Sequence, residues 1–350
     1  MKRVRVLVVD DSALVREILV KGLSMDPEID VVGSASNPYM ARDKIVELKP
    51  DVLTLDIEMP RMDGLDFLRR LMPQYPIPVV MVSALTKRGA EVTLDALAAG
   101  AVDFVTKPST DIARGLNAML GELRAKVKTA SKANLSAWKS HLPAAKPQIV
   151  SQAALARSTD KVIAIGASTG GTEAIRRIIT EFPVGMPGVV IVQHMPPGFT
   201  KHFADNLNEL SEMEVLEAQT NDRVMPGRVL IAPGGNHMTV RRSGGQYLVT
   251  CSPGENVNGH CPSVDVLFQS VAHHVAGNAL GIILTGMGKD GAQGLLEMRR
   301  AGARTMAQDE ATSVVFGMPK VAYELGGAEF LTPVTMVTKN IIDLLNGGKH

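Results

Sequence analysis

Three side chains in the second half of the chain have the types and surroundings that acyl transfer to a serine requires. Ser168 lies between glycines, and His194 directly follows a strongly apolar run. Asp290 lies in a glycine-rich segment after another apolar run. A serine hydroxyl needs a base to remove its proton, and the base needs a carboxylate that fixes its tautomer. We therefore interpret Ser168 as a nucleophile, His194 as its general acid/base and Asp290 as the orienting carboxylate.

The loop around Ser168 allows two interpretations when it is taken alone. Its Gly-x-Ser-x-Gly spacing at 166–170 matches a nucleophile elbow, and a helix N-terminus beyond it would stabilise a developing oxyanion. A glycine- and serine-rich loop before a helix also cradles phosphate in nucleotide-binding folds. The loop lacks the G-x-G-x-x-G spacing and a Walker lysine, and His194 and Asp290 favour the esterase. The chain order Ser, His, Asp differs from the Ser, Asp, His order of α/β-hydrolases.

A second set of reactive side chains lies in the first half of the chain. Asp10 and Asp11 follow one apolar run, and Asp56 ends another. In a parallel sheet these strand ends meet at one edge, where crowded carboxylates repel each other unless a hard divalent cation such as Mg²⁺ neutralises them. Lys107 and Ser83 follow two further apolar runs and are expected at the same edge. One such aspartate alone would be a helix cap, whereas the whole set predicts a phosphoryl and Mg²⁺ site.

The remaining histidines and the cysteines do not form a metal-binding pattern. We expect His202 on a helix, and His237 and His260 in polar loops. The adjacent pair 273–274 cannot share one helix face, and no HExxH motif is present. The two cysteines, Cys251 and Cys261, are expected to be free thiols in a reducing cytoplasm.

The elements that position these residues follow an α/β pattern in both halves. Short buried runs predict parallel strands, and the amphipathic segments between them predict helices, so each half is expected to be a doubly wound sheet. Such sheets bind ligands at the carboxyl ends of their strands. The strands are expected at 4–9, 31–35, 51–57, 79–83, 102–106, 162–166, 189–193, 229–232 and 281–285. The helices are expected at 12–25, 38–48, 65–71, 91–99, 172–180, 199–210, 263–275 and 291–301, with further ones from about 111 and after 333.

Length and composition indicate two globular domains joined by a linker. The chain has 350 residues, 45% of them hydrophobic and 21% charged, with a formal net charge of +1. This balance gives no overall attraction to nucleic acid or to a membrane surface. Residues 124–160 are rich in Ala, Ser, Lys and Pro, which predicts a linker between a domain at 1–123 and a domain at 161–350. Part of this segment could instead prolong the preceding helix.

The pattern of residues 2–11 is not the one expected of a secretory leader. The basic and apolar opening at 2–9 is interrupted by Asp10 and Asp11 too early for an h-region. No uninterrupted apolar run is long enough for a spanning helix, so we expect no direct membrane insertion and a cytoplasmic location.

The first domain resembles response-regulator receiver domains over about residues 1–123. The motifs that carry the resemblance are Val-Asp-Asp-Ser at 9–12, Asp-Ile-Glu-Met-Pro-Arg-Met-Asp-Gly at 56–64 and Thr-Lys-Pro at 106–108. The resemblance implies a flavodoxin-like fold, phosphorylation of Asp56 by a histidine kinase, and Mg²⁺ bound by Asp10, Asp11 and Asp56. It further implies that Lys107 contacts the phosphoryl group and that Ser83 and Phe104 form the switch.

The second domain resembles the chemotaxis receptor methylesterases of the CheB family over about residues 161–335. The matching motifs are Ile-Gly-Ala-Ser-Thr-Gly-Gly-Thr-Glu-Ala at 165–174, Gln-His-Met-Pro-Pro-Gly-Phe-Thr at 193–200, Pro-Ser-Val-Asp-Val-Leu-Phe at 262–268 and Leu-Thr-Gly-Met-Gly-Lys-Asp-Gly at 284–291. Ala-Gln-Asp-Glu at 307–310 and Val-Phe-Gly-Met-Pro at 315–319 extend the match.

This second resemblance implies hydrolysis of glutamate γ-methyl esters on methyl-accepting chemotaxis receptors, and deamidation of receptor glutamines. No cofactor is expected for the esterase chemistry. Backbone N–H groups at Thr169 and Met287 are our candidates for oxyanion stabilisation. The order of the two domains implies that the unphosphorylated receiver obstructs the esterase and that phosphorylation relieves the obstruction.

Three rival functions remain for comparison. A receiver-gated hydrolase of a small ester would use the same triad. A nucleotide-binding module would use the loop at 166–171. A DNA-binding output would need a basic recognition helix, for which the near-neutral second half shows no candidate.

Overall fold

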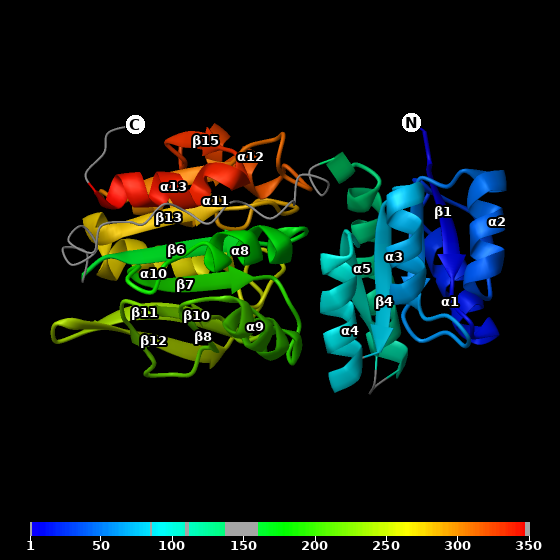
Figure 1. Ribbon diagram of the computed structural model, residues 1–350, viewed down its shortest axis with the longest axis horizontal. Coiled ribbons are helices and arrows are strands. Elements are labelled where there is room, and N and C mark those ends of the chain that lie inside the picture. The colour runs from blue at the N-terminus through cyan, green and yellow to red at the C-terminus, as the bar shows by residue number, and fades with distance from the viewer. Residues whose placement is uncertain (1, 85, 109–111, 137–159, 347–350) are drawn as a thin grey trace. The chain divides into compact units, whose positions relative to one another are not determined.

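The chain divides into two compact units, Met1–Trp138 and Lys139–His350, which we call the N-terminal and the C-terminal unit (Figure 1). The computed structural model describes residues 2–84, 86–108, 112–136 and 160–346. Each unit has its own sheet and its own buried core, and each is described separately below.

The N-terminal unit, within its described residues, is a five-stranded parallel sheet in the order β2-β1-β3-β4-β5 with helices on both faces. This is the flavodoxin-like order, so the expected fold class is confirmed. The strands are β1 (Val4–Val9), β2 (Ile29–Ala35), β3 (Val52–Asp56), β4 (Val79–Ala84) and β5 (Asp103–Lys107). The helices are α1 (Ala13–Ser24), α2 (Pro38–Leu48), α3 (Gly64–Gln74), α4 (Lys87–Ala98) and α5 (Ile112–Ala130).

The end of the N-terminal unit differs from the expectation. Helix α5 continues to Ala130, so the boundary expected at residue 123 falls inside it. Leu123, Val127 and Ala130 are fully buried, because the apolar face of the helix continues past the point where the composition changes. The alternative of a prolonged helix therefore holds for 124–130. Residues 137–159 of the expected linker lie outside the described residues.

The main sheet of the C-terminal unit has seven parallel strands in its described part, in the order β15-β14-β13-β6-β7-β10-β8. The strands are β6 (Val162–Ala167), β7 (Gly188–Gln193), β8 (Glu214–Glu217), β10 (Arg228–Ile231), β13 (Ala279–Ile283), β14 (Arg304–Gln308) and β15 (Phe330–Thr332). The chain runs outward from β6 through β7 and later returns to β13 on the other side of β6. The strand order reverses at β6, and a crevice for ligands forms at such a point.

Helices cover both faces of this sheet (Figure 1). One set is α8 (Gly171–Thr180), α9 (Phe199–Leu210) and α13 (Val334–Leu345). The other set is α10 (Val264–His274), α11 (Ala292–Arg300) and α12 (Met318–Glu324), with a 3₁₀ turn at Ala276–Asn278. The doubly wound, mainly parallel fold expected for the esterase is thus confirmed.

A small antiparallel sheet was not expected from the sequence. Its strands are β9 (Arg223–Val224), β11 (Asn236–Ser243) and β12 (Gln246–Pro253), in the order β11-β12-β9. Charged and polar residues in β11 obscure its period of two, although Met238 and Val240 point inward. His237 belongs to β11 and is buried. The expectation that it lies in a polar loop is therefore wrong.

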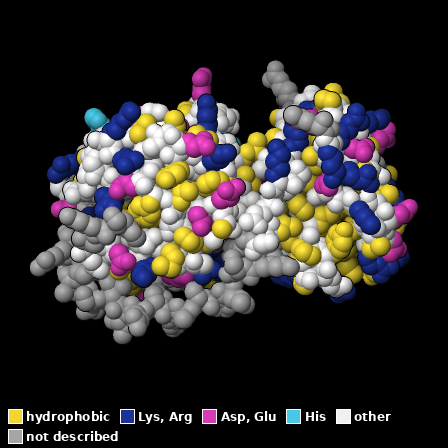
Figure 2. All heavy atoms as spheres, turned by 90° about the horizontal axis from the view of Figure 1, so that it is seen from above, with side chains coloured by type: hydrophobic (Ala, Val, Ile, Leu, Met, Phe, Trp, Pro, Cys, Tyr) yellow, Lys and Arg dark blue, Asp and Glu magenta, His cyan; other side chains and the backbone are white. Residues whose placement is uncertain are grey.

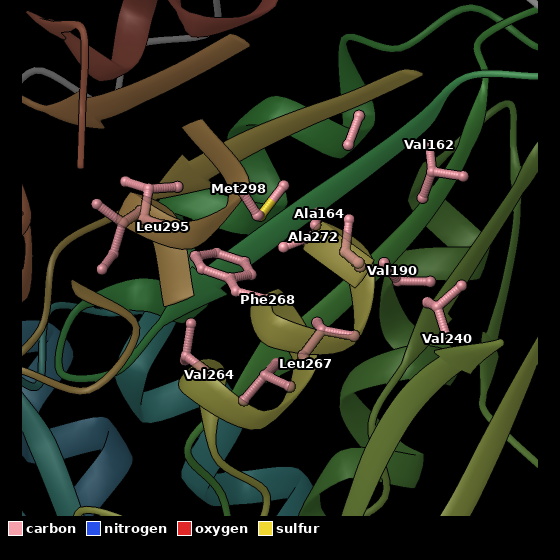
Figure 3. Packing of buried hydrophobic residues seen from close by; sticks show 14 of the residues in the cluster. Val162, Ala164, Val190, Val240, Val264, Leu267, Phe268, Ala272, Leu295 and Met298 are labelled. Atoms are coloured by element: carbon pink, nitrogen blue, oxygen red, sulfur yellow. The ribbon is translucent and has the colours of Figure 1, made fainter. Parts of the chain in front are cut away.

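Helix α10 approaches the sheet closely because glycines lie under it. Val264, Leu267 and Phe268 point from α10 into the core (Figure 3). The Cα atoms of Gly166 and Gly291 lie against Val264, so a methyl group at either position would collide with that side chain. The absence of side chains at these glycines therefore allows the first turn of α10 to pack closely against the end of β6.

The surface carries mixed charge. Basic and acidic side chains are scattered among one another on the face that Figure 2 shows, consistent with the net charge of +1. The described part of this face has no uniformly basic patch of the kind that nucleic-acid binding needs. Among the helices of the described residues, none is both long and apolar enough to cross a bilayer.

Candidate functional site

The structure places Ser168, His194 and Asp290 at the same edge of the main sheet, where its strand order reverses. Ala167 at the end of β6 pairs with Gln193 at the end of β7, so Ser168 and His194 follow neighbouring strand ends. Neighbouring strands lie about 5 Å apart, which brings the two side chains within reach of each other. Asp290 follows β13 on the other side of β6.

His194 and Asp290 form a direct hydrogen bond. The distance between His194 Nε2 and Asp290 Oδ2 is 2.8 Å, and both side chains are almost completely buried. His194 Nδ1 is also buried, and it has no hydrogen-bond partner among the described residues. With the proton on Nε2 donated to Asp290, Nδ1 carries the lone pair that can accept the hydroxyl proton of Ser168.

Three hydrogen bonds hold the backbone of Ser168 in place. Its N–H donates to Thr285 O at 3.1 Å, and its carbonyl accepts from Gly171 N at 2.7 Å and from Gln193 Nε2 at 2.9 Å. Gly286 lies so close that a Cβ there would be 2.8 Å from the Ser168 Cβ. Because Ser168 is only half-buried, its hydroxyl can meet a substrate at the edge of the sheet.

Asp290 is surrounded by hydrogen-bond donors that we did not predict. Its Oδ1 accepts from Asn258 Nδ2 and from Ser263 Oγ, both at 2.8 Å, and from Asp265 N at 3.3 Å. Its Oδ2 accepts from Val264 N at 2.7 Å, in addition to His194. The side chain of Ser263 also caps α10 by accepting from Val266 N.

These donors determine the charge of Asp290. Burial by itself would raise its pKa. The hydrogen bond and charge of His194, together with the hydrogen bonds from Asn258 and the Val264 N–H, outweigh burial and hold the pKa of Asp290 well below its usual range. Asp290 is therefore a fixed anion at neutral pH, as an orienting carboxylate has to be.

The two oxyanion candidates, Thr169 and Met287, lie close to Ser168 along the chain or through Gly286. Thr169 follows Ser168 directly, and its carbonyl accepts from Thr285 Oγ1 at 3.0 Å. Met287 follows Gly286, and its side chain is 42% exposed. The donor roles of their N–H groups stay a prediction.

The other histidines have distinct surroundings. The ring of His260 stacks on that of His194, with centroids 3.7 Å apart and planes 11° apart. His273 and His274 on α10 meet edge to face. His202 lies on α9 as expected. Cys251 and Cys261 are free thiols.

A candidate metal site lies in the N-terminal unit. Within the described residues, the one group of three or more His, Cys, Asp or Glu side chains close enough to share an ion is Asp10, Asp11 and Asp56, whose ligand atoms lie within 4.8 Å of one another. Asp10 and Asp56 are buried, and Asp11 is exposed. Oxygen ligands of this kind suit Mg²⁺.

Lys107 connects the two buried carboxylates. Its Nζ lies 3.0 Å from Asp10 Oδ2 and 2.8 Å from Asp56 Oδ1. Burial raises the pKa of Asp56 to about 6; the charge of Asp10 adds to the rise, whereas Lys107 opposes it. One lysine thus does not fully compensate the pair, and a divalent cation held by the same oxygens would supply the missing positive charge.

The two switch candidates are both buried and both engaged. Ser83 Oγ donates to Gly89 O at 3.3 Å and accepts from Thr93 Oγ1 at 2.8 Å, which ties it to α4. Phe104 is 4% exposed, and Lys126 of α5 lies over its ring at 5.2 Å from the centroid. Their switching roles stay predictions.

Comparisons with known proteins identify a family for each of the two halves of the chain. A family model described as CheB methylesterase matches residues 163–341, and one described as response regulator receiver domain matches residues 6–132. A protein-glutamate methylesterase/protein-glutamine glutaminase of Syntrophotalea carbinolica is 68% identical over 347 residues, covering 99% of this chain and 98% of that protein. A protein of the same name from Salmonella typhimurium is 50% identical, covering 100% and 99%. The crystal structure of the Thermotoga maritima CheB methylesterase catalytic domain is similar with a TM-score of 0.52 at 38% identity, covering 53% of this chain and 98% of that one.

Proposed function

This chain belongs to the CheB methylesterase family, and from that premise we propose that it is a receiver-controlled serine esterase. Its reaction is the hydrolysis of glutamate γ-methyl esters on chemotaxis receptors, together with deamidation of receptor glutamines. The observation that carries the chemistry is the buried His194–Asp290 pair at the strand end next to Ser168. A base oriented by a fixed carboxylate beside a serine is what acyl transfer requires.

Acylation begins when Ser168 Oγ attacks the ester carbonyl carbon while His194 Nδ1 takes the hydroxyl proton. The carbonyl π electrons move to oxygen, and backbone N–H groups near Thr169 and Met287 stabilise this oxyanion. When the oxyanion collapses, the bond to the methoxy group breaks and His194 returns the proton to it. Methanol leaves, and a glutamyl ester of Ser168 remains.

Deacylation repeats these steps with water. His194 takes a proton from water as the water oxygen attacks the acyl carbon, and it then protonates Ser168 Oγ as the enzyme–substrate bond breaks. The product is a glutamate side chain. With a glutamine substrate, the first leaving group is ammonia instead of methanol, so both activities need the same residues.

The N-terminal unit supplies the control. We propose that a histidine kinase transfers its phosphoryl group to Asp56, that Asp10, Asp11 and Asp56 hold Mg²⁺, and that Lys107 contacts the phosphoryl oxygens. A cation held by these carboxylates would offset the charge on them and on the phosphoryl group. The fit is supported by the two buried carboxylates, Asp10 and Asp56, which share a single lysine. A phosphorylated Asp56 raises esterase activity through a population shift.

Methanol release from methylated receptor tests the proposal. Ser168→Ala should abolish release, whereas Ser252→Ala, which removes an exposed serine of β12, should release methanol as the wild type does. Acetyl phosphate with Mg²⁺ should raise the wild-type rate and leave Asp56→Asn at its unstimulated rate. Undiminished methanol release from Ser168→Ala would reject the assignment of Ser168 as the nucleophile.

The rival functions predict different results in competition and binding experiments. Competition by a small methyl ester at concentrations far below those of the receptor would favour a small-ester hydrolase. Micromolar nucleotide binding that Ser168→Ala removes would favour the phosphate-cradle interpretation of the loop at 166–171.

A further inference from the structure

The segment 254–263, which connects β12 to α10, contacts the catalytic pair with three side chains. Asn258 and Ser263 both donate to Asp290 Oδ1, as described above. His260 lies on the other member of the pair, with its ring parallel to that of His194 at 3.7 Å. One segment thus supports both the base and its carboxylate.

A tight turn sets the position of His260. Val257 and His260 exchange two backbone hydrogen bonds of 3.0 Å, and the residues between them, Asn258 and Gly259, both have positive φ. This is the geometry of a type I′ turn, which Asn-Gly strongly favours. The turn holds its two functional side chains in a fixed relation: Asn258 extends to Asp290, and His260 covers His194.

A buried histidine holds both ends of the segment. Ser263 N donates to His237 Nδ1 at 3.2 Å, so this nitrogen carries no proton. His237 Nε2 therefore carries the proton and donates to Glu255 O at 2.8 Å. Because both ring nitrogens are engaged, His237 fixes the start and the end of the segment that presents His260.

The catalytic cycle makes the orientation of His194 critical. Its Nε2 has to remain on Asp290 while Nδ1 first accepts and then returns a proton. A rotation about the bond between Cβ and the ring would break the first contact and move Nδ1 away from the serine. The hydrogen bond to Asp290 restrains one edge of the ring, whereas a parallel ring at 3.7 Å restrains its face.

We propose that His260 is a positioning residue for the esterase reaction, holding the His194 imidazole by its face so that Nε2 stays on Asp290 and Nδ1 stays available to Ser168. This inference rests on the proposed function. His260 makes this contact with the flat face of its ring. Another planar ring at position 260 should therefore preserve the orientation of His194, whereas a side chain without a planar ring should not.

Steady-state methanol release by the full-length protein tests this role. His260→Ala should lower kcat by ~10- to 100-fold with KM changed by less than about twofold, because misorientation affects the chemical step. His260→Phe should retain kcat within about threefold of the wild type. His273→Ala, which removes an exposed histidine of α10, is the matched control and should equal the wild type. If the alanine variant unfolds, His260→Leu takes its place, since it fills the space without a planar face.

Two results would overturn the proposal. One is a wild-type kcat for His260→Ala or His260→Leu, which would mean that the stack positions nothing. The other is equal loss in His260→Phe and His260→Ala, which would assign the effect to the imidazole itself rather than to its flat face.

A readout without receptor separates this proposal from the proposed function. Reaction of Ser168 with a fluorophosphonate, measured by mass spectrometry, depends on His194 but not on the natural substrate. Slow labelling in His260→Ala with normal labelling in His260→Phe supports the positioning role even if the wild type releases no methanol, an outcome that would reject the proposed function alone. Equal labelling in all variants rejects the positioning role.

Discussion

Asp56 and Asp290 are a matched pair of carboxylates with opposite electrostatics. Each lies at the carboxyl edge of a parallel sheet where the strand order reverses, and each is almost completely buried, at 3% and 2% exposure. The pKa of Asp56 is raised to about 6, whereas that of Asp290 lies well below its usual range. Burial acts in the same direction on both, so their neighbours cause the difference.

The neighbours differ in the number of hydrogen-bond donors that they offer to each carboxylate. Asp290 accepts hydrogen bonds from two backbone N–H groups and from the side chains of Asn258, Ser263 and His194. Asp56 has Lys107 as its side-chain donor, and Asp10 shares that lysine. Both oxygens of Asp290 have hydrogen-bond donors, as its proposed role in orienting His194 requires. The set of donors around Asp56 is smaller, which suits a group that has to bind a cation and accept a phosphoryl group.

The largest expected difference between the two carboxylates is in the chemical step. Asp290→Asn should lower kcat for methanol release by about 10⁴-fold, because the amide cannot fix the tautomer of His194. Asp56→Asn should instead lose the increase that acetyl phosphate causes. Methanol release with and without the phosphodonor measures both, and similar losses of the unstimulated rate in the two variants would refute the comparison.

The next difference is the pH dependence of stability in EDTA. Folding raises the pKa of Asp56. The contribution of this carboxyl group to the stability of the N-terminal unit is therefore complete below about pH 4 and is lost as the pH rises through about 6. Asp56→Asn should therefore stabilise the N-terminal unit by about 1 to 3 kcal/mol at pH 8 and by much less at pH 4.

Asp290 should show the opposite pH dependence, because its pKa is lowered on folding. The contribution of Asp290 to the stability of the C-terminal unit is complete above about pH 4 and is lost as the pH falls below that value. Hydrogen exchange of the full-length chain reports each unit separately. An Asp56→Asn variant that is less stable than the wild type at pH 8 would contradict the assignment.

Removing one donor from Asp290 should have a smaller effect. Asn258 Nδ2 lies 2.8 Å from Asp290 Oδ1 and 2.7 Å from Asp265 Oδ2, so Asn258→Ala leaves two buried carboxylates without a shared donor. We expect a loss of about 2 kcal/mol in the C-terminal unit, in line with hydrogen bonds to charged groups. Denaturant unfolding followed by hydrogen exchange measures it, and an unchanged stability at pH 7 would contradict the role of Asn258.

The smallest expected effect is that of Mg²⁺ on the unmodified protein. At tenfold excess over its dissociation constant, the ion should stabilise the N-terminal unit by about 1.4 kcal/mol and leave the C-terminal unit unchanged. Asp11→Asn alters the exposed member of the candidate metal site and should weaken this protection without disturbing the buried pair. Equal protection of both units by Mg²⁺ would argue against a site confined to Asp10, Asp11 and Asp56.

The positions of Asp56, Ser168 and His194 could be predicted because they depend on topology. A residue that ends or directly follows a buried parallel strand lies at the carboxyl edge of the sheet, and apolar runs locate those strands well. Asp290 could be predicted for a similar reason, since its glycine-rich turn follows β13.

The positions of Asn258, His260 and His237 could not be predicted in this way. They depend on β11 and β12, whose alternation is obscured by charged residues in β11 and by polar residues in both strands, and on a turn that reaches His194 and Asp290 through tertiary contacts. A polar segment with histidine and asparagine is typical of a loop, and its sequence does not say what it contacts. The boundary at residue 123 failed to match α5 for a related reason, because burial rather than composition decides where that helix ends.

The close approach of α10 affects how a mutational scan of this protein should be interpreted. Val264 N donates to Asp290, and no substitution of Val264 by another residue with an N–H group removes that donor. Its position depends instead on the missing side chains of Gly166 and Gly291. A scan would therefore record the loss of this contact at two glycines without chemistry of their own, whereas losses at Val264, a fully buried core residue, would report packing and not its N–H donor.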